Sequence, residues 1–284
     1  MANELTGEMT EVAEAPGGER LRELRRAAGR TQLWVETEAE LGTGYLQRLE
    51  AGRVAKPGAD TLTRILNALD ARYSERREIM ERFGYTVATP LPTADDIRWA
   101  WTEARRDLDE VALPAYVLDC THRLIAWNRF LPHLLGVPPD HRVLDELAQG
   151  SMIVHWFYPA SPLALLLAEP DGFLLEIARV MRDEMRRFWS EPWAAELIAE
   201  HMAAIPRFRA MWNAAESAPA TASAARALIP LRLRVPGAGL LSFHFSSEPF
   251  SRDARFRVIY YFPADPETMR QCAVWAARHG ESDG

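Results

Sequence analysis

The chain contains 284 residues, of which 48% are hydrophobic and 26% are charged. These values are those of an ordinary globular protein and exclude extended disorder, a collagen-like chain and a coiled-coil rod. The formal net charge of −7 argues against a protein that coats nucleic acid along its whole length. A chain of this length is expected to form two domains.

Neither a membrane span nor a secretion signal is indicated by the sequence. The longest apolar stretch, around Leu163–Ala168, is far shorter than the ~20 residues that a bilayer-spanning helix needs. The acidic N-terminus lacks the basic-then-apolar order of a signal peptide. The two cysteines, Cys120 and Cys272, have no metal-ligand spacing and form no disulfide framework. We therefore expect a cytoplasmic protein with no membrane partner and no bound metal.

Charge is spread unevenly along the chain. Residues 1–18 hold four acids and no base, residues 19–83 hold 13 Lys and Arg against 11 Asp and Glu, and the remainder holds 20 against 25. Residues 19–83 are thus the only one of these segments with a net positive charge, and a contact with nucleic acid is expected there. Residues 1–18, which end in Pro16-Gly17-Gly18, are expected to form a flexible tail.

Short helices are predicted after this tail. Leu21, Leu24 and Ala28 share one helix face, and Gly29 is typical of a helix C-terminus. Thr31 is expected to cap a second helix. Three more helices are predicted over about 43–51, 61–69 and 74–83, the last of them capped by Ser74. A short helix, a tight turn and a second short helix form the layout of the helix-turn-helix. An all-α domain is therefore expected over residues 19–86.

Several spaced features of this segment occur in one order. They are Leu24-Arg25, Thr31-Gln32, Gly44-Tyr45-Leu46, Leu49-Glu50-x-Gly52, Pro57, and Thr61-Leu62 with Ile65 and Leu69. Together they make the run resemble the Xre/Cro-like repressor helix-turn-helix. The resemblance implies binding to a double-stranded DNA operator, and operators of this class usually have two half-sites, so a homodimer is expected.

The third helix would enter the major groove, with its N-terminal residues nearest the base edges. Gln reads adenine and Arg reads guanine. Gln32 resembles the residue that grips a phosphate in this family, and Arg30 and Arg53 are further candidates for phosphate contacts. The DNA-binding candidates are Gln32, Thr43, Gly44, Gln47, Arg48 and Arg53. Arg48 could instead be an ordinary solvated residue, and Glu50 is expected to anchor the turn by accepting backbone hydrogen bonds.

The segment also departs from the pattern of the family. Glu36 stands where a small apolar residue is usual, Glu40 where Gly is common, and Gly42 replaces the usual Ser cap of the third helix. If Glu36, Glu38 and Glu40 were exposed, they would repel phosphates. DNA affinity would then be weak or would depend on the avidity of a dimer.

A second domain is expected after Thr89–Thr93, where two prolines indicate a linker over residues 87–94. A helix is predicted from Thr93 or Asp95 to about Glu110. Two short strands, 115–118 and 123–127, form a hairpin signature, and a short helix follows over 129–135. After a long helical region, residues 227–235, 239–245 and 255–263 alternate apolar and polar side chains and are typical of strands. The predicted fold of residues 95–284 is α+β, a five-stranded antiparallel sheet with helices on one face.

Asp119 on the predicted hairpin and Asn128 after its second strand make this segment resemble the opening of a PAS-type sensor domain. The whole chain, over about residues 19–275, resembles the MmyB-like regulators, which join an Xre-type helix-turn-helix to a PAS-like ligand-binding domain. The resemblance is carried by Ser74-Glu75-x-Arg77, Asp119, Trp127-Asn128, Ala178–Arg182, Phe208 with Trp212, and Phe262-Pro263-Ala264. It implies a transcription regulator that senses a small molecule.

A pocket between the sheet and its helices is the expected place for that ligand. Aromatic walls suit an apolar or amphipathic molecule such as a fatty acid, and Arg182 or Arg186 is expected to bind a carboxylate head. The ligand-binding candidates are Trp127, Trp156, Phe157, Arg182, Arg186, Trp189, Phe208, Trp212 and Phe243. Aromatic stripes at helical spacing are more often core, however, and Arg182 could form a structural ion pair.

No enzyme motif is found in the sequence. It contains no GxSxG, HExxH, P-loop or GxGxxG, and its seven histidines show no metal-ligand spacing. We therefore expect no catalytic residue and no cofactor other than a bound ligand. The preferred function is a ligand-responsive DNA-binding transcription regulator. The alternative is a small-molecule or lipid-binding protein whose degenerate helix-turn-helix mediates protein contacts, and an enzyme of unknown chemistry ranks last.

Overall fold

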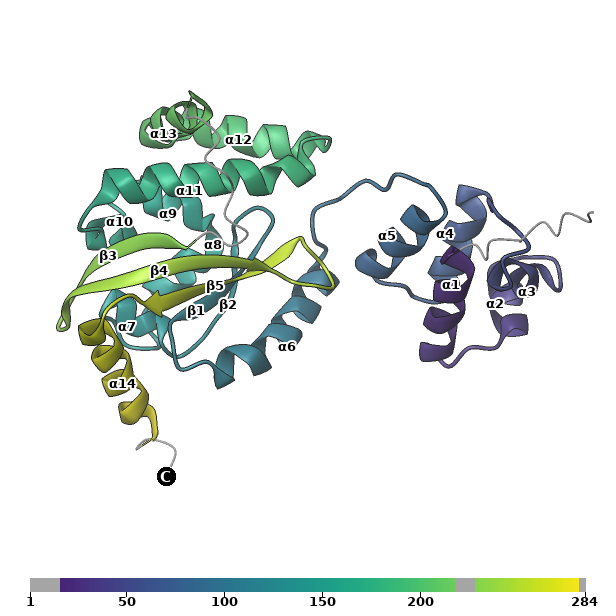
Figure 1. The fold of residues 1–284 in the computed structure, drawn as a ribbon, viewed down its shortest axis with the longest axis horizontal. Coiled ribbons are helices and arrows are strands. Elements are labelled where there is room, and N and C mark those ends of the chain that lie inside the picture. Colours follow the sequence, from purple (N-terminus) through teal and green to yellow (C-terminus); the bar gives the residue numbers. More distant parts are fainter. Residues whose placement is uncertain (1–15, 218–227, 281–284) are drawn as a thin grey trace, which may run out of the picture. The chain divides into compact units, whose positions relative to one another are not determined.

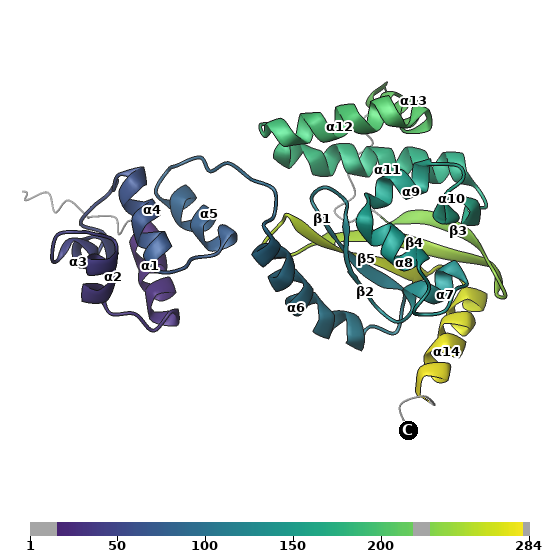
Figure 2. The ribbon, with the colours of Figure 1, turned by 180° about the vertical axis from the view of Figure 1, so that it is seen from behind.

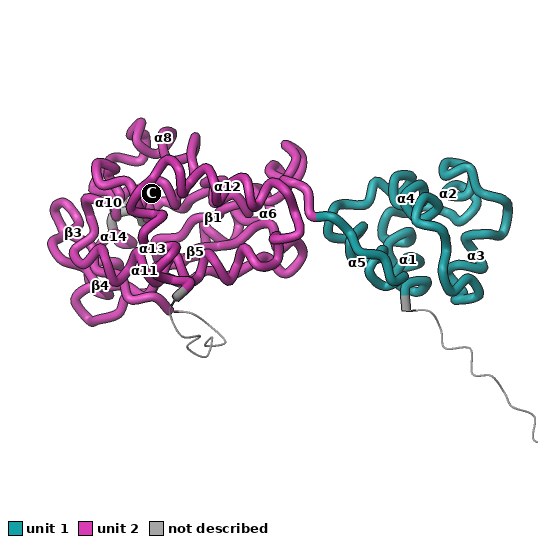
Figure 3. Tube along the Cα trace, turned by 90° about the horizontal axis from the view of Figure 1, so that it is seen from above, with its two compact units in different colours: residues 1–88 teal, residues 89–284 magenta. Residues whose placement is uncertain are grey.

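A computed structural model of the chain describes residues 16–217 and 228–280. The chain divides into two compact units, residues 1–88 and 89–284 (Figure 3). The described part of the first unit consists of α1 (Pro16–Ala27), α2 (Gln32–Glu38), α3 (Tyr45–Glu50), α4 (Ala59–Ala68) and α5 (Tyr73–Arg82). Their apolar faces meet in one core, which includes Leu21, Val35, Leu46, Leu49, Leu62 and Ile65.

Helix α1 begins earlier than the sequence predicts. Pro16 occupies its first turn, where a proline costs no intrahelical hydrogen bond. Gly17 and Gly18 are buried, and a Cβ atom on Gly18 would lie 2.4 Å from the carbonyl oxygen of Leu49. The two glycines therefore let α1 pack closely against its neighbours, instead of ending a tail. The rest of the expected tail, residues 1–15, lies outside the described residues.

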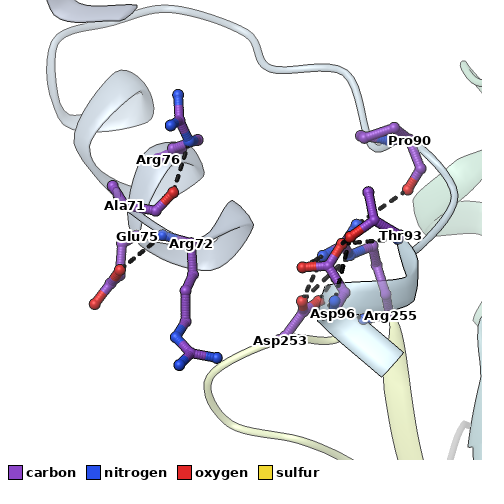
Figure 4. A network of polar contacts seen from close by, with 9 residues as sticks. All are labelled: Ala71, Arg72, Glu75, Arg76, Pro90, Thr93, Asp96, Asp253 and Arg255. Carbon is purple, nitrogen blue, oxygen red and sulfur yellow. Dashed lines mark hydrogen bonds and ion pairs between the residues drawn. The ribbon is translucent and has the colours of Figure 1, made fainter. Parts of the chain in front are cut away.

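The predicted start of α2 is confirmed, but that of α5 is wrong. The Thr31 hydroxyl caps α2 by accepting a hydrogen bond from the Trp34 amide at 3.1 Å. Helix α5 begins at Tyr73, so Ser74 lies inside it. The Glu75 carboxylate caps this helix instead, because it accepts a hydrogen bond from the Arg72 amide at 2.9 Å (Figure 4). A charged acceptor in the first turn also suits the helix dipole.

The second unit contains an antiparallel sheet of five strands in the order β2-β1-β5-β4-β3. The strands are β1 (Ala115–Asp119), β2 (Leu124–Trp127), β3 (Ile229–Val235), β4 (Gly239–Pro249) and β5 (Phe256–Pro263). The described helices are α6 (Ala94–Glu110), α7 (Leu131–Leu135), α8 (Val143–Gln149), α9 (Met152–Phe157), α10 (Pro162–Leu166), α11 (Pro170–Met185), α12 (Pro192–Ala204), α13 (Pro206–Ser217) and α14 (Pro266–Gly280), with a 3₁₀ turn at Arg186–Phe188. The predicted five-stranded α+β architecture is therefore correct (Figure 1).

Helices cover both faces of the sheet, which corrects the expectation of a single helical layer. Ala104 and Leu108 of α6 pack against Val117, Ala126 and Val258 on one face. The larger core lies on the other face, where alternate residues such as Tyr116, Phe243 and Ile259 meet helices that include α9 and α11. Figures 1 and 2 show α6 and the α11–α13 layer on opposite sides of the sheet.

Asn128 fixes the end of the first hairpin. Its Oδ1 accepts hydrogen bonds from the amides of Ala115 (3.1 Å) and Phe130 (3.2 Å), and its Nδ2 donates to the carbonyl oxygen of Leu113 at 2.6 Å. Asn128 is buried, with 2% of its surface exposed. One side chain thereby satisfies three backbone groups that would otherwise be buried without partners.

Replacing Asn128 with Ala is expected to destabilise the second unit. The substitution leaves buried backbone groups unsatisfied and should lower the free energy of unfolding by about 3 kcal/mol. Urea unfolding followed by tryptophan fluorescence reports this unit, because eight of the nine tryptophans lie after residue 98. Equal stability of the Asn128→Ala variant and the wild type would contradict the assignment.

The first residues of the second unit are tied to its helices and sheet. The Thr89 amide donates to Glu191 Oε1 at 2.7 Å, and its carbonyl oxygen accepts from Trp193 Nε1 at 2.8 Å. The buried Arg255 donates to the Pro90 carbonyl oxygen at 3.3 Å and pairs with Asp96 and Asp253 (Figure 4). Residues 89–96 are therefore held by side chains that come from α12 and from the segment before β5.

Candidate functional site

The outer side of α3 carries exposed polar side chains. Leu46 and Leu49 face the core of the first unit, whereas Gln47 and Arg48 are exposed. The Arg48 guanidinium lies 5.9 Å from the centre of the Tyr45 ring. Among the other DNA-binding candidates, Thr43 and Arg53 are exposed and Gly44 is half-buried with φ +80°. The exposed residues include side chains that can donate hydrogen bonds to base edges and phosphates.

Glu36 supplies the cap that α3 lacks in its own sequence. Gly44, at the N-terminus of α3, has no side chain to cap the helix. The Glu36 carboxylate of α2 accepts hydrogen bonds from the Gly44 amide (3.1 Å) and the Leu46 amide (2.8 Å). Glu36 is 4% exposed. The condition under which Glu36 would repel phosphates is therefore not met, because its carboxylate is buried and bonded inside the domain, whereas Glu38 and Glu40 are exposed.

Glu50 joins α1, α2 and α3 through side-chain donors. It accepts two hydrogen bonds from the Arg25 guanidinium, at 2.6 and 2.9 Å, and one from Gln32 Nε2 at 2.8 Å. We expected backbone donors, and this expectation is wrong. The hydrogen bond to Glu50 raises the pKa of Arg25, so its guanidinium stays charged. Gln32 is thus held in place by Glu50 at the start of α2.

A concave basic surface lies beside these residues. Arg22, Arg25, Arg26 and Arg30 line it together with Thr31, Gln32 and Gln47, and Glu50 is the one acid in its lining. The Arg30 guanidinium stacks on the Trp34 ring with 4.1 Å to its centre. Positive charge beside an exposed helix suits the phosphate backbone of duplex DNA.

The second unit contains a small cavity between the inner face of the sheet and helices α9 and α11. Its volume is about 30 Å³, which is the volume of one water molecule in the liquid. Apolar side chains make up most of its lining, namely Leu118, Met152, Ile153, Trp156, Ile177, Val180, Met181, Phe245 and Ile259. Trp156 also packs edge-on against Phe173, with 5.1 Å between ring centres.

Four polar residues also line this cavity: His122, Glu184, Ser247 and Arg257. Glu184 Oε1 accepts a hydrogen bond from the Ser247 hydroxyl at 2.6 Å. Glu184 Oε2 forms an ion pair with Arg257 Nη1 and lies 3.8 Å from His122 Nε2. Within the part of the chain that the structure describes, neither ring nitrogen of His122 has a hydrogen-bond partner.

Burial sets the charges of this polar group. Desolvation, and after it the nearby positive charge of Arg257, together lower the pKa of His122 to about 3. Desolvation also lowers the pKa of Arg257, to about 10. At neutral pH the cavity is therefore lined by a neutral imidazole and a charged guanidinium. Tyr116, which also lines it, has its pKa raised by burial and is a neutral hydroxyl.

Two family models match the chain. A helix-turn-helix domain matches residues 18–79, and the MmyB-like transcription regulator ligand binding domain matches residues 102–273. The chain belongs to the MmyB-like transcription regulators. A search of curated proteins finds no match to it. The two matched domains make it a ligand-responsive transcription regulator.

Most of the predicted ligand-binding residues of this MmyB-like regulator lie away from the cavity. Trp156 lines it. Phe157, Phe208, Trp212 and Phe243 are buried in the core around it, and Trp127 is half-buried on β2. Arg182 pairs with Glu216 at 3.1 Å and stacks on Trp212. Arg186 and Trp189 are mostly exposed.

The polar lining of the regulator's cavity was missed by the sequence analysis. The position of Arg257 could have been inferred from the sequence. It lies two residues before Ile259 and four before Tyr261 on β5, and side chains at every second position of a strand face the same side of the sheet. No comparable local signal marks His122, which lies in the turn between β1 and β2. Across the described ranges 16–217 and 228–280, no cluster of three metal-ligating side chains is found, and no helix there is long and apolar enough to cross a membrane.

Proposed function

We propose that this regulator binds a double-stranded DNA operator as a homodimer and changes its operator affinity when a small amphipathic, fatty-acid-like molecule enters the second unit. One observation carries the ligand part of the proposal. The mainly apolar cavity is also lined by a buried guanidinium and by an imidazole without hydrogen bonds. Buried polar groups without partners are costly, so a core built only for stability gains nothing from keeping them.

The cavity must enlarge to accept such a molecule. Its volume of about 30 Å³ is far below the roughly 300 Å³ of the smallest ordinary ligand pockets. Met152 and Met181 line it, and methionine side chains adapt their shape readily. Met152 lies on α9 and Met181 lies on α11. If these side chains move to admit a ligand, the two helices are expected to shift with them.

The proposal also includes the type and boundaries of each domain and the cellular location. We place an Xre-type helix-turn-helix over residues 19–86, a linker over 87–94 and a PAS-like domain over 95–284, in a cytoplasmic protein. The strand order β2-β1-β5-β4-β3, with helices between β2 and β3, supports the PAS-like assignment. The alternative, protein contacts in place of DNA binding, drew its support from three acids before α3, and the burial of Glu36 removes one of them.

Denaturing mass spectrometry of the purified full chain tests the ligand part by identifying the small molecule that it carries.

For the DNA part, duplexes selected by the protein from a random-sequence library serve as probes. Their affinity is then measured at several salt concentrations with and without dodecanoate. We expect binding that weakens with salt and a shift in affinity on adding dodecanoate. Binding of random and selected duplexes with equal affinity would exclude sequence-specific regulation.

Substitutions on α3 test the recognition helix. Arg48→Ala and Gln47→Ala should each cost about 1–3 kcal/mol of specific binding, because each removes contacts to base edges. Gln32→Ala should weaken binding to all sequences alike, since its proposed partner is a phosphate. Competition assays with selected and random duplexes separate the two effects. An Arg48→Ala variant that binds selected duplexes as well as wild type would disprove the assignment.

A further inference from the structure

We propose that the polar lining of the cavity is a carboxylate-binding site, in which Arg257 and His122 hold the carboxylate of a ligand and Glu184 occupies its place when the site is empty. This inference rests on the proposed function and names the chemical class of the head group. It also replaces Arg182 and Arg186, the carboxylate partners that the sequence suggested, with residues that line the cavity.

Arg257 is the cation of the site. It lies on β5, where its neighbours in register are Leu118 on β1 and Pro249 on β4, so it belongs to a central strand of the sheet. Only 4% of its surface is exposed. A buried guanidinium needs an anion beside it, and its planar fork of N–H donors matches a carboxylate. The sheet therefore holds a carboxylate-binding group at a fixed position in the cavity wall.

His122 is the second donor. It lies in the turn between β1 and β2 with φ +64°, and this turn is held by Asp119, whose Oδ1 accepts from the amides of Thr121 and Arg123 at 2.8 and 3.0 Å. His122 is 2% exposed. The 3.8 Å between its Nε2 and Glu184 Oε2 is too long for a hydrogen bond. A neutral imidazole offers one donor and one acceptor, so a ligand oxygen closer to the ring would satisfy it.

Glu184 is suited to be displaced. It stands in the last turn of the 16-residue helix α11, where a negative charge opposes the helix dipole. Its side chain is 21% exposed, whereas that of Arg257 is 5% exposed. Apart from Arg257, it bonds to the Ser247 hydroxyl, which water can replace. Glu184 can therefore turn toward solvent, whereas Arg257 and His122 cannot.

The site selects a monocarboxylate with an apolar body. The group now paired with Arg257 is itself a carboxylate, so a ligand with the same head can take its place without altering the charge at the guanidinium. The remainder of the lining is mainly apolar and includes Leu118, Met181 and Ile259, which suit an alkyl or aryl chain. A larger dianion would place more negative charge beside one guanidinium and one neutral imidazole.

Binding of dodecanoate and dodecanol to the full chain tests the site, because the two probes share a chain and differ in the head group. Isothermal calorimetry on Glu184→Gln should show dodecanoate bound about tenfold more tightly than by wild type, which equals about 1.4 kcal/mol. Dodecanol should bind both proteins equally. Glu176→Gln is the matched control, since Glu176 lies on the same helix but pairs with Arg179 and is 43% exposed.

Arg257→Met completes the test. It should abolish the preference for dodecanoate over dodecanol, with folding checked by circular dichroism. If this variant fails to fold, Glu184→Gln still decides, because tighter binding cannot arise from misfolding. Equal affinity of the two probes for wild type, or no gain in Glu184→Gln, overturns the carboxylate site but leaves the proposed function intact. Binding of neither probe overturns the amphipathic ligand of the proposed function as well.

Discussion

Glu50→Ala is expected to lower the free energy of unfolding of the first unit by about 3–5 kcal/mol. The Glu50 side chain is fully buried and the Arg25 side chain is 10% exposed. Removal of the carboxylate leaves the Arg25 guanidinium without its anion and removes the acceptor of Gln32. Amide hydrogen exchange of residues 16–82, measured by mass spectrometry, reports this loss as faster exchange in α1 and α3.

Two further variants control this experiment. Glu50→Gln keeps the size of the side chain and one acceptor oxygen, so its loss should be smaller. Glu78→Ala breaks a half-exposed ion pair with Arg20 and should cost less than about 1 kcal/mol. If Glu50→Ala were no more damaging than Glu78→Ala, the buried pair would have no special role in the stability of the unit.

Glu36→Ala is expected to lower the affinity for selected duplexes about tenfold or more. The variant leaves the amides of Gly44 and Leu46 without their acceptor, and loss of hydrogen bonds to a charged group costs about 2 kcal/mol. The first turn of α3, which includes Gln47 and Arg48, should then lose its order. Fluorescence anisotropy with selected duplexes measures the effect on binding.

A second substitution can restore the lost cap. In the Glu36→Ala background, Gly42→Ser places a hydroxyl two residues before Gly44, the N-cap of α3. A serine side chain there can accept a hydrogen bond from the Gly44 amide, so part of the affinity should return. Glu38→Ala is the matched control, because Glu38 is an exposed acid of the same helix. Its removal should leave affinity unchanged or slightly higher, since it lessens repulsion from phosphates. Unchanged affinity of Glu36→Ala would show that α3 needs no cap from α2.

Periodicity was sufficient to predict the main elements of the fold. The alternation of residues 229–235, buried at every second position, and the capping of α2 by Thr31 are local features that a sequence displays directly. Long-range contacts were not visible in the same way. Gly18 had the pattern of a loop residue because nothing local shows that Leu49 lies against it. The exposure of Glu36 could not be decided from the sequence, because its two partners lie at the start of another helix.

The cavity was harder to predict than the fold. Aromatic residues such as Phe208 and Phe243 are strong indicators of burial but do not separate core from pocket, and both are packed in the core. Arg257 could have been placed on the inner face from the alternation of β5. Its approach to Glu184 could not have been predicted, because it depends on how α11 crosses the sheet, which no local pattern specifies.

Two side-chain contacts tie Thr89 to the start of α12. Glu191 accepts a hydrogen bond from the Thr89 amide, and Trp193 donates one to the Thr89 carbonyl oxygen. Trp193 lies in the first turn of α12. The chain leaves for the helix-turn-helix at this residue. A displacement of α12 would therefore act on the residue at which the chain passes from one unit to the other, which gives the helical layer a covalent route to the helix-turn-helix.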